Sequence, residues 1–106
     1  MPVYMIIEIT ITDPEVYSRY VAGVFDIVSA HGGRYLVRGG KITPLLGNWQ
    51  PERIILIEFD SMAQVETCFG SAEYLELAPL REQATTSRAI IVEGYRQSFE
   101  AESPAR

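Results

Sequence analysis

The sequence predicts an α+β domain whose elements follow in the order strand, helix, strand, strand, helix, strand. An apolar run with a period of two at residues 3–11 precedes helical spacing over residues 14–30. Two further apolar runs, residues 34–38 and 53–59, are joined by a polar, glycine-rich connection. After them come a helical region and a last apolar run at residues 89–95. The chain is therefore nearly symmetric about its central pair of strands.

The first strand and helix are defined by their boundaries as well as their periodicity. Apolar residues occupy every second position of residues 3–11, so one face of this strand is wholly apolar and the other is mixed. Asp13 followed by Pro14 is typical of a helix N-terminus. His31 and the two glycines after it predict where this helix ends.

The second half carries its own start and stop residues. The connection over residues 39–51 is long for a hairpin loop, and this length favours a functional loop or additional pairing. Ser61 with Gln64 forms a capping box that predicts the start of the next helix. Ser71 is placed to cap a further helical piece, which we expect to bend at Pro79.

This order predicts a ferredoxin-like fold, in which a four-stranded antiparallel sheet in the spatial order 4-1-3-2 carries both helices on one face. We expect residues 1–96 to form this domain and residues 97–106 a flexible tail. The apolar strand positions expected beneath the helices are Met5, Ile7, Ile9, Ile55, Ile57, Phe59, Ile90 and Val92. The positions left on the uncovered face are Ile6, Leu36, Leu56 and Ile91. A soluble chain rarely exposes such a contiguous apolar patch, so we expect a homodimer that covers it.

Composition limits the protein class. At 106 residues, 47% of them hydrophobic and 22% charged, the chain has the size and make-up of one globular domain. No apolar run reaches the length of a membrane span, and no signal peptide is evident. A net charge of −5 argues against nucleic-acid binding. The single cysteine, Cys68, allows no internal disulfide and fits the cytoplasm.

Several spaced motifs resemble one family of small bacterial proteins. They include His31-Gly32-Gly33-Arg34-Tyr35-Leu36-Val37-Arg38-Gly39-Gly40, Trp49-x-Pro51-x-Arg53, Glu58-Phe59, Ser71-x-Glu73-Tyr74, Leu80-Arg81 and Glu93-Gly94-Tyr95. Over about residues 2–95 the chain resembles the Domain of Unknown Function 1330 family. The resemblance implies a dimeric α/β barrel, in which two ferredoxin-like sheets pack face to face around a central cavity. It supplies no reaction, because the function of that family is not established.

The resemblance has departures that bear on chemistry. Relatives usually have an acidic residue just before the Gly-x-Trp motif, where this chain has Leu46. They usually have an aromatic residue at the position of Cys68 and often a proline at that of Ala72. The fold class implies, by analogy, cofactor-independent proton-transfer or oxidative chemistry in a small-molecule cavity, between sheet and helices or between subunits. The alternative is a non-catalytic ligand-binding or assembly module.

The mixed face of the sheet supplies the first candidate site. Antiparallel pairing predicts three rows across it: Tyr4 with Glu58 and Arg34, Ile6 with Leu56 and Leu36, and Glu8 with Ile54 and Arg38. In one interpretation Glu58 has a raised pKa and acts as a general base, while Arg34 and Arg38 bind a small anionic molecule. In the other, these charges are interfacial ion pairs that set the register of the dimer.

Residues outside these rows are also candidates, and most of them allow both a functional and a structural interpretation. His31 is the only histidine, and it either transfers protons or caps the helix that it ends. Trp49 either closes a pocket on a planar ligand or anchors its own loop. Tyr74 is a ligand-binding candidate, and its neighbour Arg81 either joins it or solvates that surface. Cys68 has apolar neighbours and is predicted to be a core residue. One histidine and one cysteine make a metal site improbable, and we predict no cofactor because no phosphate-binding glycine pattern occurs.

Overall fold

The structure is a computed structural model that describes residues 1–95. The predicted tail at residues 97–106 lies outside these described residues. The strands are β1 (Val3–Ile11), β2 (Arg34–Arg38), β3 (Arg53–Phe59) and β4 (Thr85–Glu93), and the helices are α1 (Pro14–Ala30), α2 (Met62–Phe69) and α3 (Ala72–Ala84).

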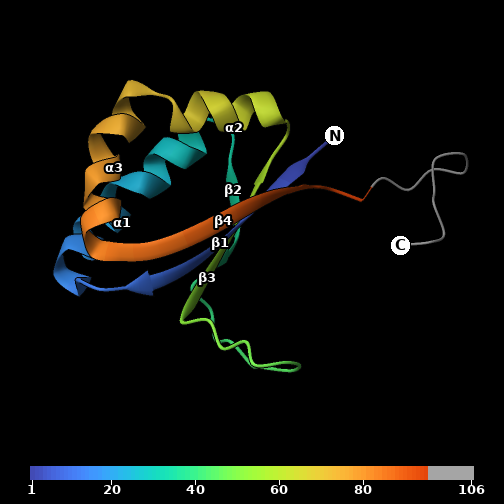
Figure 1. Ribbon diagram of the computed structural model, residues 1–106. Helices are drawn as coiled ribbons and strands as arrows, with labels where there is room; N and C mark the ends of the chain where they lie inside the picture. The colour runs from blue at the N-terminus through green and yellow to red at the C-terminus, as the bar shows by residue number, and fades with distance from the viewer. Residues whose placement is uncertain (96–106) are drawn as a thin grey trace, which may run out of the picture.

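The strands form one antiparallel sheet in the order β2-β3-β1-β4, which confirms the predicted ferredoxin-like arrangement. Figure 1 shows the three helices on the same side of this sheet. The connection between β2 and β3, residues 39–51, projects away from the body of the molecule in the same view and is called the arm below. The opposite side of the sheet, which no described helix covers, is called the open face.

The predicted helix starts are confirmed by their side-chain contacts. The backbone N–H of Val16 donates to Oδ1 of Asp13 over 3.2 Å, and Pro14 follows the cap as expected. Ser61 Oγ accepts from the N–H of Gln64 over 3.3 Å, and Ser71 Oγ accepts from the N–H of α3's third residue over 3.2 Å. In a capping box the Gln64 side chain would accept from the backbone N–H of Ser61. Here it accepts instead from the N–H of Asp60, one residue earlier in the chain. Each cap satisfies an N–H group that a helix start leaves without a partner.

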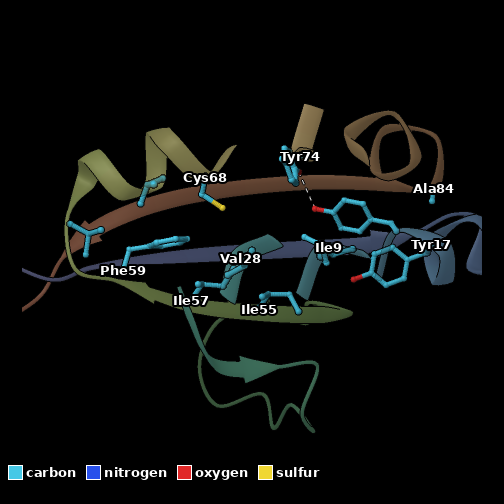
Figure 2. Packing of buried hydrophobic residues seen from close by; sticks show 13 residues of the cluster. Ile9, Tyr17, Val28, Ile55, Ile57, Phe59, Cys68, Tyr74 and Ala84 are labelled. Carbon is cyan, nitrogen blue, oxygen red and sulfur yellow. Dashed lines mark hydrogen bonds between the residues drawn. The ribbon is translucent and has the colours of Figure 1, made fainter. Parts of the chain in front are cut away.

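The core lies between the helices and the inward face of the sheet (Figure 2). Val28 of α1, Phe59 of β3 and Cys68 of α2 are fully buried, and Ile57 of β3 is 2% exposed. The prediction that Cys68 is a core residue is confirmed, and burial raises the pKa of its thiol to about 11. Chain segments far apart in sequence therefore meet in one apolar cluster.

The last strand differs from its prediction in start and in phase. It begins at Thr85, directly after α3, four residues before the predicted start at residue 89. Ile91 pairs with Met5 and packs against the core, whereas Ile90 and Val92 pair with Ile6 and Tyr4 on the open face. The predicted sides of Ile90, Ile91 and Val92 were therefore wrong. Consecutive apolar residues carry no alternation, so their phase comes only from pairing with β1.

A β-bulge in β2 produces the second departure. Arg34 pairs with Glu58 and Tyr35 with Ile57 as expected, but Val37 then pairs with Leu56. Leu36 is thus an extra residue, and everything after it moves to the other face. Arg38 pairs with Ile55 on the helix side, so its predicted place in a row with Glu8 and Ile54 was wrong.

Candidate functional site

The predicted row of Tyr4, Glu58 and Arg34 forms on the open face. Tyr4 Oη donates to Glu58 Oε2 over 2.9 Å, and Arg34 Nε donates to Glu58 Oε1 over 3.0 Å. Arg34 also pairs with Asp60 over 2.9 Å. Hydrogen bonds from Arg34 and then Tyr4 lower the pKa of Glu58, so the expected raised pKa was wrong. A carboxylate held ionised by two donors is a weak base, and this geometry favours the ion-pair interpretation.

Glu8 also lies on the open face, but its partner differs from the one expected. Arg88 Nε of β4 donates to Glu8 Oε1 over 2.7 Å, in place of Arg38. This pair borders an open groove of about 340 Å³. The groove is lined by Ile6, Glu8, Trp49, Ile54, Arg88, Ala89 and Ile90. It is a shallow, largely apolar surface with one neutralised ion pair.

His31 and Trp49 are separate from each other and from the Glu58 cluster. His31 Nδ1 donates to the carbonyl of Ile27 over 2.9 Å, so this side chain caps the end of α1. That contact favours the structural interpretation of His31. Trp49 is 56% exposed in the arm and borders the groove on the open face. Leu45 and Leu46, at 94% and 87% exposed, make the arm strongly apolar at its tip.

A second site lies on the other side of the sheet, between α1 and the inward faces of β1 and β3. It is a cavity of about 50 Å³, called the helix-side cavity below. Half of its lining residues are aliphatic, and Phe69 of α2 adds an aromatic ring. The polar groups in its lining are the tyrosines Tyr17, Tyr20 and Tyr35 and the arginines Arg38, Arg53 and Arg81. This volume has room for roughly four water molecules or one small organic ligand.

Arg38 and Arg53 stand at the two ends of the arm and both reach this cavity. Arg53 Nε donates to Tyr17 Oη over 3.1 Å. The guanidinium of Arg38 lies over the ring of Phe25, 4.8 Å from its centroid, and over that of Tyr35 at 5.1 Å. Stacking on aromatic faces leaves the N–H edges of a guanidinium available to a ligand.

Arg81, Tyr74 and Tyr20 form a hydrogen-bonded chain at the α3 side of the cavity. Arg81 Nε donates to Tyr74 Oη over 3.2 Å, and the hydroxyls of Tyr74 and Tyr20 lie 2.9 Å apart (Figure 2). Tyr20 and Arg81 line the cavity, whereas Tyr74 does not. Tyr74, a predicted ligand-binding residue, therefore lies behind Tyr20 rather than in the lining.

The helix-side cavity is rich in hydrogen-bond donors and carries positive charge. Among the residues that the structure describes, 1–95, none with a carboxylate or imidazole lines it. Among residues 1–95, no acidic side chain forms an ion pair with Arg38 or Arg53, while Arg81 has only a 3.9 Å contact with Glu82. Burial raises the pKa of Tyr35 to about 12 and that of Tyr20 further still, so both hydroxyls keep their protons. Such a lining suits an anion or another hydrogen-bond acceptor.

Five polar residues of this cavity were missed as site candidates in the sequence, namely Tyr17, Tyr20, Tyr35, Arg53 and Arg81, although the pattern held a signal for some of them. Tyr17 and Tyr20 sit one turn apart on the apolar face of a helix, where each hydroxyl needs a polar partner. Arg53 shares the inward phase of Ile55, which places an arginine on the core side of β3. Arg81 was weighed only as a neighbour of Tyr74.

Comparison with known families decides the chain's relationship. The sequence profile of the family described as "Domain of unknown function (DUF1330)" matches residues 2–95. The chain belongs to the DUF1330 family. No curated protein matches this DUF1330 chain. The family description assigns no activity, so the residues of the chain itself carry the evidence for its function.

Solved structures similar to this DUF1330 protein share its fold at low sequence identity. A protein of unknown function from Rhodopseudomonas palustris has a TM-score of 0.78 at 18% identity, with 91% of this chain and 84% of that chain covered. A dabb family protein with a ferredoxin-like fold from Mesorhizobium loti has a TM-score of 0.69 at 13% identity, covering 90% and 98%. SnoaB, a cofactor-independent oxygenase from Streptomyces nogalater, has a TM-score of 0.63 at 14% identity, covering 93% and 97%. These likenesses confirm the ferredoxin-like fold.

Within residues 1–95, no helix has the length and apolar character required to cross a membrane. The same residues contain no group of three or more His, Cys, Asp or Glu side chains arranged to hold a metal ion.

Proposed function

We propose that this protein binds a small organic anion in the helix-side cavity. The observation that carries the proposal is the pair Arg38 and Arg53, two guanidiniums that line an apolar cavity and have no acidic partner among the described residues. Arg38 is exposed and Arg53 partly exposed at the border of the cavity, so both guanidiniums keep N–H groups that can donate to an anion. A carboxylate is the simplest such ligand, because its two oxygens match a guanidinium fork.

The size and polarity of the cavity narrow the ligand. Room for roughly four water molecules corresponds to ~120 Å³ of liquid, the volume of a three-carbon acid, so a five-carbon acid such as pentanoate fits with its carboxylate extending past the cavity border toward the exposed Arg38. The aliphatic wall suits a hydrocarbon chain, and the arginines at its border suit the acid group. The donor-rich lining disfavours a cationic ligand.

Binding is better supported than proton abstraction by a protein base. The cavity lining contains no carboxylate or imidazole, and Glu58 and His31, the two predicted catalytic residues, belong to contacts elsewhere. The likeness to SnoaB is a likeness of fold, and the cofactor-independent oxygenase activity belongs to that protein. The function that this site supports is therefore recognition of a small acid.

The test is calorimetric titration of pentanoate into the wild type and three arginine variants. Arg38→Met and Arg53→Met keep an apolar stem but remove the guanidinium. Arg19→Met is the matched control, because Arg19 is exposed on α1 and does not line the cavity. We expect each cavity variant to bind about tenfold to a hundredfold more weakly, and the control to match the wild type. Equal affinity in all four proteins, or no binding by the wild type, would overturn the proposal.

We also propose that the protein is a homodimer, in which a second copy of the chain covers the open face. Ile90, Val92 and Val37 are 63%, 46% and 39% exposed there, although all three are apolar. Exposed apolar patches of this kind are typical of interfaces, and a symmetric dimer covers the same patch on both copies. The ion pairs of Glu58 and Glu8 then lie within or beside the contact.

Light scattering distinguishes the assembly from a monomer. We expect the wild type at micromolar concentration to have twice the mass of one chain. Ile90→Glu should yield monomers, because two buried carboxylates without partners are unfavourable in a dimer interface. Leu75→Glu is the control, since Leu75 is 58% exposed on α3, away from the open face. A monomeric wild type, or a dimer that persists in Ile90→Glu, would contradict this assignment.

A further inference from the structure

The order of donors and acceptors in the Arg81–Tyr74–Tyr20 chain can be worked out from its chemistry. A guanidinium only donates, so Tyr74 Oη accepts the hydrogen bond from Arg81 Nε. The contact between Tyr74 and Tyr20 allows either hydroxyl to be the donor. Both side chains are buried, at 6% and 7% exposed, so a proton without an acceptor would be costly here.

Only one direction of the hydrogen bond between Tyr74 and Tyr20 lets each hydroxyl proton have an acceptor, either in the network or in the cavity. If Tyr20 donated to Tyr74, the proton of Tyr74 would have no acceptor in this network and would lie outside the cavity. If Tyr74 donates to Tyr20, the proton left over is that of Tyr20, which lines the cavity. The positive charge of Arg81 also favours this direction, because it makes the hydroxyl that it contacts a stronger donor.

We propose that the Tyr20 hydroxyl is a second polar anchor in the helix-side cavity, and that the ligand is a short carboxylic acid with a second acceptor oxygen. This inference rests on the proposed function, since Arg38 and Arg53 hold the carboxylate. Tyr74 is a positioning residue, because it lies outside the cavity lining and directs the Tyr20 proton toward the ligand. Arg81 polarises Tyr74 and also lines the cavity itself.

The spacing of Tyr17 and Tyr20 on α1 is a guide to the class of acid. Arg53 donates to Tyr17 over 3.1 Å, and the ring centroids of Tyr17 and Tyr20 are 6.1 Å apart, so Tyr20 is one side chain further along α1 than the partner of Arg53. A second oxygen next to the carboxylate, as in a 2-oxo acid, would remain beside the arginine anchor. An oxo or hydroxyl oxygen a few carbons further along the chain spans a separation of this order. The favoured class is therefore a short oxo or hydroxy acid such as 4-oxopentanoate.

The experiment compares two acids that differ by one carbonyl oxygen, pentanoate and 4-oxopentanoate. The wild type should bind 4-oxopentanoate about threefold to tenfold more tightly, the gain expected from one neutral hydrogen bond. Tyr20→Phe should lose the preference for 4-oxopentanoate, so that the ratio of its two dissociation constants approaches one. Arg81→Met should reduce the preference, because Tyr74 is then less polarised. Tyr95→Phe is the control and should keep the wild-type preference, since Tyr95 is 74% exposed and does not line the cavity.

The outcomes separate this inference from the function on which it rests. Equal affinity of the wild type for the two acids would overturn the role of Tyr20 and leave the arginine site standing. A preference that survives Tyr20→Phe would overturn it as well. Failure of the wild type to bind either acid would overturn both proposals. A urea unfolding transition like that of the wild type shows that Tyr20→Phe is folded. If Tyr20→Phe is unfolded, Tyr74→Phe serves in its place, and it should reduce the preference for 4-oxopentanoate because the Tyr20 hydroxyl then lacks the donor that directs it; an undiminished preference would overturn the inference.

Discussion

Gly39 and Gly47 provide a matched test of how the arm holds Arg53. Both have left-handed backbones, with φ of +74° and +75°. A β-carbon at Gly39 would overlap Nη1 of Arg53, whereas one at Gly47 would meet nothing within 4 Å. Alanine at either position therefore introduces the same backbone strain, of about 1–2 kcal/mol. Only alanine at Gly39 also displaces the guanidinium.

The additional cost of Gly39→Ala follows from the contact that the displaced guanidinium loses. Arg53 donates to Tyr17 over 3.1 Å, and a hydrogen bond of this kind contributes roughly 0.5–1.5 kcal/mol. The far end of an arginine moves easily, so we expect the side chain to shift while the strands keep their places. Gly39→Ala should therefore be less stable than Gly47→Ala by about that amount.

Two measurements on both variants check this reasoning. Urea denaturation gives the free energy of unfolding, and titration with pentanoate gives the affinity of the helix-side cavity. Gly47→Ala should lose stability but bind as the wild type does, while Gly39→Ala should lose more stability and about tenfold in affinity. Equal unfolding free energies together with equal affinities would show that Arg53 is not held against Gly39 as the structure has it.

Three further predictions concern the core, the open face and the buried thiol. Ile57→Ala should lower the free energy of unfolding by about 2–5 kcal/mol in urea, because this side chain is 2% exposed; a loss below about 1 kcal/mol would contradict its core position. The pKa of Glu58 is below its ordinary value of 4.5, so its contribution to stability is complete above that pH and is lost as the pH falls through the lower, folded value. Urea denaturation from about pH 6 to about pH 3 should therefore show a smaller acid loss for Glu58→Gln than for the wild type, and identical slopes would remove the effect. Cys68 is fully buried and burial raises its pKa to about 11, so a thiol reagent at neutral pH should label it only when urea unfolds the chain; rapid labelling of the native protein would contradict this.

Much of the fold could be predicted from the sequence because its determinants are local. The period of two in β1 and the caps at Asp13, Ser61 and Ser71 depend on neighbouring residues only. The order of elements then leaves few ways to pair four strands, which is why the ferredoxin-like topology followed. The row of Tyr4 and Glu58 was also predictable, since it depends on two regular, uninterrupted strands.

Arg38 was named as a ligand-binding residue, and its position on the sheet differs from the one predicted. Strict alternation along β2 placed it on the open face, whereas it lines the helix-side cavity. The bulge at Leu36 reverses that placement, and a bulge is a property of pairing between two strands. No propensity in a five-residue strand indicates where one extra residue will be accommodated.

By itself, the sequence determined which segments become strands and helices, where each helix starts, and to which family the chain belongs. Tertiary structure alone decided which face Arg38 and Ile91 occupy, because one-residue shifts in register exchange the two faces of a strand. It also decided that Arg53 reaches Tyr17 and that Arg81 reaches Tyr20 through Tyr74. These contacts join residues that local patterns treat independently, and they exist only once α1 and α3 pack on the same face of the sheet.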